Sequence, residues 1–230
     1  MQPEHLLDPA SALIVVGGTL LATVLRCGAG DCLTTVVALG TLLRRPFDPE
    51  RARSDMAVQV QEIRQDGVIR SRPAPTGDAE FDEATAMLIG SRSLGALQLA
   101  HAAHKRRRIE TSQRAVRTFI QAADLSPVFG LAGTLVALNQ LPPLDQPGAD
   151  FAAAISMAVL TTLYGLLLGN LLFTPLARVL ARRAADEERD RQAVIDWLER
   201  QVADALPHGE RPHGERPHAE RARHAVDVPA

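Results

Sequence analysis

Three long stretches of the sequence carry no ionisable side chain, and they constrain the fold more than any other feature. They are residues 9–25, 125–144 and 151–177. A helix needs about 20 residues to cross the ~30 Å hydrocarbon core of a bilayer, within a range of roughly 17–25. A surface helix of a soluble protein shows one polar stripe, whereas these stretches contain only isolated hydroxyl and amide side chains. The sequence therefore predicts an all-α integral membrane protein with three transmembrane helices.

The overall composition conceals this division. A net charge of −2, 46% hydrophobic residues and a mean hydropathy of −0.01 are typical of a soluble protein. The balanced charge excludes an overall basic field for nucleic acid, and 3% aromatic residues exclude a ladder of base-stacking rings. Cys27 and Cys32 are the only cysteines, too few for a disulfide framework.

The basic residues predict the orientation in the membrane. Residues 1–8 and 142–150 contain four acids and no Lys or Arg, and all 25 basic residues lie in 26–124 or 178–230. Since cytoplasmic loops are enriched in Lys and Arg, the N-terminus and residues 142–150 are predicted outside, and the long central segment and the tail in the cytoplasm. A secretory signal begins with positive charge, so residues 9–25 are interpreted as a retained span.

Helical spacing of apolar residues predicts further helices on the cytoplasmic side. Residues 27–43 are apolar apart from Asp31, but a span there would place the Arg-rich loop outside, so an interfacial or bundle helix running on from the first span is expected. Residues 49–69 are expected to form a helix, 70–78 a loop because Pro and Gly interrupt the pattern, and 79–124 helical structure again.

Two charged segments have simple interpretations. Residues 104–108 (HKRRR) indicate a solvated helix face near anionic lipid or a partner rather than a nucleic-acid site, and His101 and His104 are expected at the surface. Residues 178–206 predict a charged helix whose apolar face suits self-association or contact with neighbouring subunits; this face comprises Val194, Ile195, Trp197, Leu198 and Val202.

The tail repeats a five-residue unit, PHGER, PHGER and PHAER, over residues 207–221. Proline at every fifth position prevents a helix, so a disordered tail is predicted. Its histidines are interpreted as a product of repeat slippage more than as a weak metal site.

The spans contain no Asp, Glu, Lys, Arg or His. Proton relays through membranes normally use an intramembrane ionisable group, so a chain of this kind that moves ions must obtain that group from another chain. Hydrolase, P-loop, HExxH and dinucleotide-binding motifs are absent from the sequence, which predicts no enzyme, cofactor or resident metal.

The last two spans contain small residues and two prolines. Gly130 and Gly133, and Gly165 and Gly169, are expected to allow close helix packing.

Pro127 and Pro175 each leave a carbonyl four residues earlier without its helical donor. Thr134 and Thr162 either bond within their helices or line a pathway, and both roles stay open; for Thr161, Tyr164 and Asn170 the local role is favoured.

Each predicted span resembles a segment of one family, the MotA/TolQ/ExbB proton channels. Residues 123–138 (ADLSPVFGLAGTLVAL) resemble its penultimate span, with Pro-x-x-Gly and Gly-Thr. Residues 157–180 (MAVLTTLYGLLLGNLLFTPLARVL) resemble its last span, with Thr-Thr-x-Tyr-Gly, a following Asn and the proline before the cytoplasmic exit. Residues 8–23 (DPASALIVVGGTLLAT) are similar to the second helix of MotA-type flagellar stators, which favours that branch.

The resemblance implies a pentamer in the bacterial inner membrane, enclosing a dimer of single-span, MotB-like partners that each supply a membrane aspartate. It implies that Pro127 and Pro175 lie near that aspartate, and that Thr134 and Thr162 form a polar ring facing it. Proton flow, or less commonly sodium flow, would rotate the ring, and the cytoplasmic domain would pass torque to the flagellar rotor.

The resemblance is incomplete in two places. MotA-type proteins have four spans, and the first is missing here, so the start site is wrong, the gene is truncated or a three-span form exists. Arg64 matches a rotor-contacting Arg, but Val68, Ile69 and Arg70 stand where the family's Glu is expected. Three spans with an outside N-terminus is also the TolQ/ExbB arrangement, so an envelope energiser is the alternative, with a non-conducting scaffold as a third possibility.

The resulting organisation has five parts. They are a first transmembrane helix (1–27), a cytoplasmic helical domain (28–122), a two-span proton-channel domain (123–180), a charged cytoplasmic helix (181–206) and a disordered tail (207–230).

Overall fold

The computed structural model describes residues 8–42, 46–67, 70, 75–141 and 149–203, and every regular element in these ranges is a helix. The elements are α1 (Pro9–Ala12), the π-helix η2 (Leu13–Gly17), α2 (Gly18–Cys27), α3 (Ala29–Leu42), α4 (Pro49–Asp66), α5 (Ala79–Ser91), α6 (Leu94–Asn139), α7 (Ala149–Leu167), the π-helix η3 (Leu168–Phe173) and α8 (Thr174–Val202). Three helical rods are long and apolar enough to cross a membrane: Pro9–Cys27, Leu94–Asn139 and Phe151–Val202. The predicted all-α fold with three spans is confirmed, and the predicted tail lies outside the described residues.

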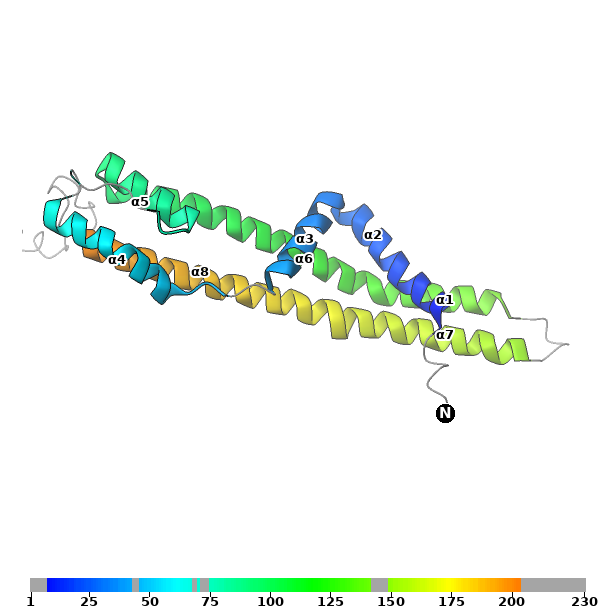
Figure 1. The fold of residues 1–230 in the computed structure, drawn as a ribbon. Coiled ribbons are helices and arrows are strands. Elements are labelled where there is room, and N and C mark those ends of the chain that lie inside the picture. Colours follow the sequence, from blue (N-terminus) through cyan, green and yellow to red (C-terminus); the bar gives the residue numbers. More distant parts are fainter. Residues whose placement is uncertain (1–7, 43–45, 68–69, 71–74, 142–148, 204–230) are drawn as a thin grey trace, which may run out of the picture.

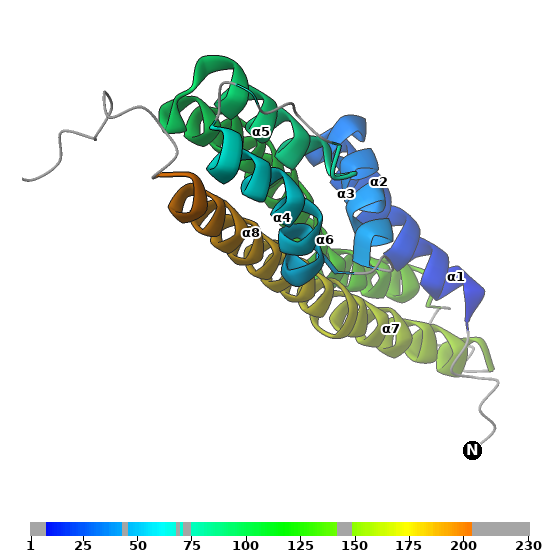
Figure 2. The same ribbon diagram turned by 60° about the vertical axis from the view of Figure 1, so that its left-hand side comes forward.

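Two long antiparallel rods organise the molecule (Figure 1). The first is α6, and the second is the continuous run α7–η3–α8, which lies beside it along its length. The domain boundaries predicted at 122/123 and 180/181 fall inside these rods, so no break in the chain separates membrane and distal parts. A second view shows α4 beside α8 and α5 beside α6 at the end opposite the α6–α7 connection (Figure 2).

The first span ends in a fold-back. Asp8 caps its start by accepting hydrogen bonds from the backbone N–H groups of Ala10 and Ser11, and Pro9 occupies the first turn, where no N–H is needed. Gly28 ends the span with a φ of 87°, a conformation that favours glycine, and α3 then turns back toward α6. A helix packed in the bundle is present as expected, but the expectation that it runs on from the first span is wrong.

A second break divides the helical segment predicted over residues 79–124. Arg92 adopts a left-handed conformation with a φ of 57°, and the side chain of Ser93 accepts a hydrogen bond from the N–H of Gly95 to start α6. This cap turns α5 back along α6 as a helical hairpin.

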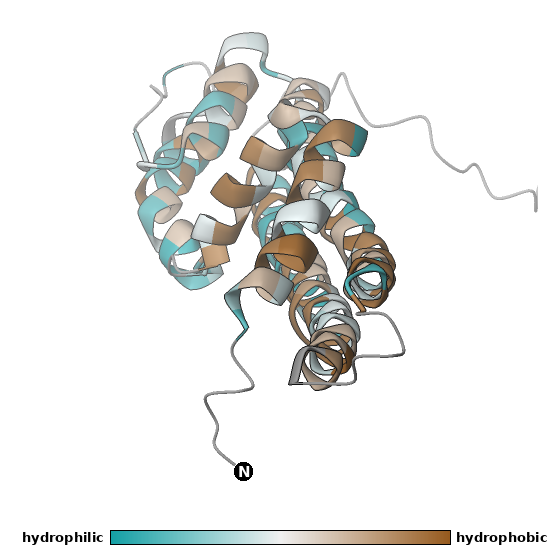
Figure 3. Cartoon of the chain, turned by 90° about the vertical axis from the view of Figure 1, so that its right-hand side faces the viewer, coloured by the Kyte–Doolittle hydropathy of each residue, from teal (hydrophilic) through white to brown (hydrophobic). Residues whose placement is uncertain are grey.

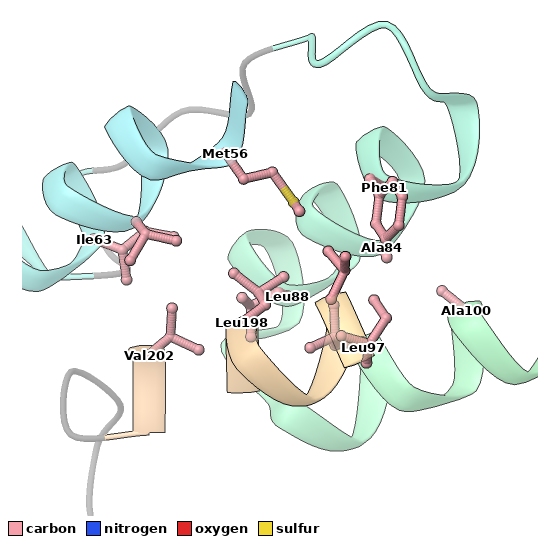
Figure 4. Close-up of a cluster of buried hydrophobic side chains, with 12 residues drawn as sticks. Met56, Ile63, Phe81, Ala84, Leu88, Leu97, Ala100, Leu198 and Val202 are labelled. Atoms are coloured by element: carbon pink, nitrogen blue, oxygen red, sulfur yellow. The ribbon is translucent and has the colours of Figure 1, made fainter. Parts of the chain in front are cut away.

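Four helices enclose an apolar core in what we call the distal lobe: α4, α5, the first half of α6 and the second half of α8. Figure 4 shows Met56 and Ile63 from α4, Leu88 from α5 and Leu198 from α8 pointing toward one another, all at most 1% exposed. The apolar face of α8 was expected to serve self-association, but these side chains of the same chain cover it. The expectation of self-association is wrong, because the residues that cover this face of α8 lie far from it in the sequence.

The other half is apolar on its outside. Brown ribbon covers much of α1–α3 and of the rods' near ends in Figure 3. Large side chains stand open there, including Leu25 at 77%, Leu135 at 68% and Leu171 at 72% exposure. Such a surface suits lipid or neighbouring subunits rather than water. We call α1, η2, α2, the end of α6, α7 and η3 the membrane half.

His101 and part of the basic run differ from expectation, whereas His104 is partly exposed and pairs with the exposed Glu83. His101 is 4% exposed rather than at the surface, because its Nδ1 lies 2.8 Å from Oε1 of Glu80 on α5. Arg106 and Arg107 are exposed as predicted, whereas Arg108 turns inward and donates to Glu80. The solvated face predicted for residues 104–108 is thus only part of that run.

Candidate ion-pathway face

Glycines bring the two rods of the membrane half into backbone contact. A Cβ atom placed on Gly165 would lie 2.7 Å from the carbonyl oxygen of Ser126 and 2.9 Å from Cα of Gly130. A Cβ atom on Gly133 would lie 2.7 Å from Cβ of Thr161. Since real Cβ atoms do not come this close to backbone atoms or to the Cβ of a packed side chain, these positions require glycine for the observed packing.

Pro127 and Gly169 meet at the same crossing. Pro127 has no N–H, so the carbonyl of Ala123 lacks its usual helical donor. The oxygen of that carbonyl lies 2.7 Å from where a Cβ atom of Gly169 would stand, so only a residue without a side chain leaves it uncovered. The freed carbonyl therefore faces the backbone of η3, where weak Cα–H contacts are the available donors.

Pro175 follows a widened stretch of the second rod. The π-helix η3 ends at Phe173, and the backbone N–H of Thr174 bonds to the carbonyl of Gly169, five residues back. Its hydroxyl donates to the same oxygen at 2.9 Å. Insertions of this kind in α-helices often mark functional sites. Pro175 is exposed two residues after Phe173, which is buried toward α6, so it points away from α6.

Thr134 and Thr162 lie on one side of the α6–α7 pair. Gly133 and Thr161 face each other at the contact, and Thr134 and Thr162 each follow one of them by one residue. One residue turns a side chain by about 100°, and because the helices are antiparallel both turns lead to the same side. Pro127 follows the contact residue Ser126 in the same way, so the structure gathers Pro127, Thr134 and Thr162 on what we call the open face.

The first span packs on the opposite side. Phe129 precedes Gly130, and its ring lies against Gly18 of α2. Tyr164 precedes Gly165, and its hydroxyl lies 3.4 Å from the backbone N of Asp8. The open face is therefore the side of the rods that the first span leaves uncovered, and Pro175 is not brought into it.

The threonine hydroxyls keep acceptor capacity on the open face. Thr134 donates to the carbonyl of Leu131 at 2.6 Å, and Thr162 donates to that of Ala158 at 3.2 Å. A hydroxyl has one donor and two lone pairs, so each oxygen remains an acceptor toward an approaching group. The local bonds and the pathway role are thus compatible, and both side chains are half-buried.

Thr161 and Asn170 act locally, as favoured, whereas the local role favoured for Tyr164 is wrong, because its hydroxyl reaches the backbone N of Asp8 in the first span. Thr161 is 0% exposed and donates to Ala158, and the exposed Asn170 donates to Leu166. Among the described residues no group of three or more His, Cys, Asp or Glu side chains could hold a metal ion.

Sequence reasoning missed an apolar groove between the first span and the second rod. Its volume is about 650 Å³, and both π-helices contribute to it, through Val16 of η2 and Leu168 of η3. Asp8 and Tyr164 lie at its polar margin. Pro175 was the available signal for a widened helix, whereas η2 has no proline to indicate it.

Arg64 lies far from this site. It is exposed on α4 in the distal lobe, and its Nη1 donates to Oε1 of Gln201 on α8 at 3.1 Å. Its rotor contact stays a prediction. Val68 and Ile69, where the family's Glu was expected, lie outside the described residues.

Comparison with known proteins identifies relatives of the whole arrangement. The family model for the MotA/TolQ/ExbB proton channel family matches residues 79–193. Chemotaxis protein PomA of Vibrio alginolyticus is 26% identical over 191 residues, covering 82% of this chain and 75% of its own, and Motility protein A of Cereibacter sphaeroides is 29% identical over 195 residues, covering 83% and 76%. The flagellar MotAB stator complex from Bacillus subtilis matches with a TM-score of 0.75 at 22% identity, over 89% of this chain and 82% of that one. The C. jejuni MotAB structure matches with a TM-score of 0.73 at 20% identity, over 91% and 88%.

Proposed function

The chain belongs to the MotA/TolQ/ExbB proton channel family, and from that premise we propose that it is the channel-forming subunit of a MotA-like flagellar stator. The observation that carries this proposal is the open face, where Pro127, Thr134 and Thr162 gather on charge-free spans. The relatives named Motility protein A and the fold shared with MotAB stator complexes support the MotA branch. The sequence resemblance to this family is thereby confirmed.

A partner completes the pathway. The open face offers hydroxyl oxygens but no proton-binding group, so a single-span, MotB-like partner supplies a membrane aspartate against it. The ion passes from water to that carboxylate and on to the cytoplasm, while Thr134 and Thr162 accept hydrogen bonds from its protonated form or coordinate sodium. Protons are the favoured ion, and the chain itself contributes no catalytic group, cofactor or resident metal.

The assembly surrounds the partner. A ring of these chains, a pentamer by resemblance, turns the open face of each copy toward a central partner dimer and leaves the first span outside. The open apolar side chains of the membrane half then meet neighbouring copies and lipid of the bacterial inner membrane.

Long continuous rods suit the transmission of torque. Because α6 and α7–η3–α8 pass without a break from the spans into the distal lobe, a displacement at the open face moves the lobe with it. The lobe, with Arg64 on its surface, is the part that meets the flagellar rotor.

Isolation of the partner tests this function. We expect the tagged chain, purified in mild detergent, to retain a single-span protein with a membrane Asp and a peptidoglycan-binding domain. Recovery of a partner with a short periplasmic TonB-interacting domain instead supports the TolQ/ExbB-like energiser. Recovery of no single-span partner contradicts both channel functions and leaves the non-conducting scaffold.

A further inference from the structure

His101 lies at the junction of three helices of the distal lobe, with a hydrogen-bond acceptor at each ring nitrogen. Its Nδ1 lies 2.8 Å from Oε1 of Glu80 on α5, and its Nε2 lies 3.1 Å from Oε1 of Gln192 on α8. An ionised carboxylate only accepts hydrogen bonds, so Nδ1 must carry a proton.

The orientation of the Gln192 amide is set by its other neighbours. Nζ of Lys105, which can only donate, lies 3.0 Å from Oε1 of Gln192. The amide nitrogen donates to Oδ1 of Asp196 at 2.9 Å. The oxygen of Gln192 therefore faces His101, and Nε2 must donate as well. A ring that donates from both nitrogens is the imidazolium cation.

The surrounding charges favour the same protonation state. Ion pairs join four carboxylates to three permanently charged side chains around His101. The carboxylates are Asp78, Glu80, Glu187 and Glu188, and the cations are Lys105, Arg108 and Arg191. A proton on His101 supplies the fourth positive charge. The buried Oε1 of Glu188 makes no hydrogen bond, and the nearest charged donors are Lys105 at 3.5 Å and His101 at 4.0 Å.

We propose that His101 is a proton-operated lock, which as an imidazolium ties the α5–α6 hairpin to α8 and on losing its proton releases that tie. Deprotonation leaves one ring nitrogen as an acceptor facing another acceptor, either Glu80 or Gln192. A buried pair of acceptors without a shared proton is destabilising, so the lobe loosens where α8 continues toward the last span. The lobe thereby responds to the pH on its own side of the membrane.

The direction of the response follows from the pKa of His101. The hydrogen bond to Glu80 raises this pKa above its ordinary value against the opposing effect of burial, with help from Gln192 and Glu188. A group whose pKa is higher in the folded state stabilises that state fully below its unfolded pKa of about 6.5. That stabilisation is lost as the pH rises through the folded pKa, so alkaline conditions open the lock.

Two measurements on the full chain in detergent test the lock. Exchange of the imidazole C2 hydrogen, followed by mass spectrometry, gives the titration midpoint of His101 in the unmodified protein. We expect it above 6.5, and a midpoint at or below 6.5 overturns the proposal without requiring any variant to fold.

The second measurement uses Trp197, the single tryptophan, which packs against the lobe core and whose fluorescence reports lobe unfolding. Between pH 6 and pH 9 we expect the thermal midpoint to fall by a few degrees in the wild type. The fall should disappear in His101→Gln and persist in His104→Gln, whose ring lies on the same helix against the exposed Glu83. An equal fall in His101→Gln and the wild type overturns the lock.

Discussion

The membrane half and the distal lobe are built from the same two rods but are held together differently. In the membrane half the rods meet backbone to backbone at Gly130, Gly165 and Gly169. In the lobe they are held apart by buried side chains such as Leu97 and Leu198, with ion pairs around them. Lipid gives no hydrophobic drive between helices, so close approach must supply the attraction, whereas in water the burial of apolar side chains does so. The helix α6 therefore packs through glycine backbone in the membrane half and through buried apolar side chains in the lobe.

The largest effect is expected where backbone meets backbone. Gly165→Val places a side chain against the carbonyl of Ser126 and Cα of Gly130, neither of which can move aside. We expect no detergent-stable assembly on size-exclusion chromatography. Gly40→Val is the matched control, because a Cβ atom there meets nothing within 4 Å. Wild-type elution of Gly165→Val would contradict glycine packing as the basis of the membrane half.

The next largest effect is expected from removing a buried charge, and it concerns the stability of the lobe alone. Glu80, 4% exposed, accepts from His101 and Arg191 and from Arg108. Glu80→Ala removes the carboxylate that the three cations share and leaves the buried His101 without a hydrogen-bonded carboxylate, although Arg108 keeps Glu188 and Arg191 keeps Asp78 and Glu187. It should lower the free energy of lobe unfolding by about 3–5 kcal/mol. Denaturant titration followed by Trp197 fluorescence measures it. Glu83→Ala, at a side chain 60% exposed, should change the free energy of unfolding by less than about 0.5 kcal/mol. Equal losses of stability in the two variants would show that burial of Glu80 does not set its contribution.

A comparable effect follows from the apolar core of the lobe. Leu97 is 0% exposed and Leu99, two residues on, is 73% exposed. Leu97→Ala removes buried methyl groups and should cost about 2–5 kcal/mol in the same titration, while Leu99→Ala should be close to neutral. Similar values for the two variants would show that the lobe core does not hold α6 in place.

Much of the fold follows from local patterns in the sequence, and the rest depends on distant partners. The glycines that meet at the crossing have helical spacing, and the charge-free stretches match the three spans, because both features are set within one helix. The burial of His101 could not be foreseen, since Glu80 and Gln192 lie 21 and 91 residues away along the chain.

The two helix breaks had weaker local signals. Gly28 ends the first span, and Ser93 caps α6. The sequence stays apolar after Gly28, and the helical spacing of apolar residues continues across Arg92, so neither helix break was predicted. The open face was implied by resemblance alone, because the side to which Thr134 and Thr162 turn depends on which residues meet at the crossing.

The smallest effect on stability is expected at a glycine whose added side chain would meet no other atom. Gly90, near the end of α5, has no atom within 4 Å of an added Cβ and no positive φ. Gly90→Ala should stabilise the lobe by up to about 0.5–1 kcal/mol, because alanine loses less backbone freedom in a helix. Gly77→Ala should destabilise it, since Gly77 has a φ of 85°. Destabilisation by Gly90→Ala in the denaturant titration would show that the lobe is packed as tightly as the membrane half.

If the open face carries the ion past a partner's carboxylate, proton flux depends on the hydroxyl groups of Thr134 and Thr162. Flux is measured in cells that express the chain with its single-span partner. Replacing Thr134 and Thr162 together by Val removes two acceptors worth about 0.5–1.5 kcal/mol each, and should lower flux on the order of tenfold with assembly unchanged. Thr34→Val, at a threonine of α3 that bonds its own helix at 2.9 Å, should leave flux unchanged. Wild-type flux in an assembled Thr134→Val, Thr162→Val variant would contradict the account.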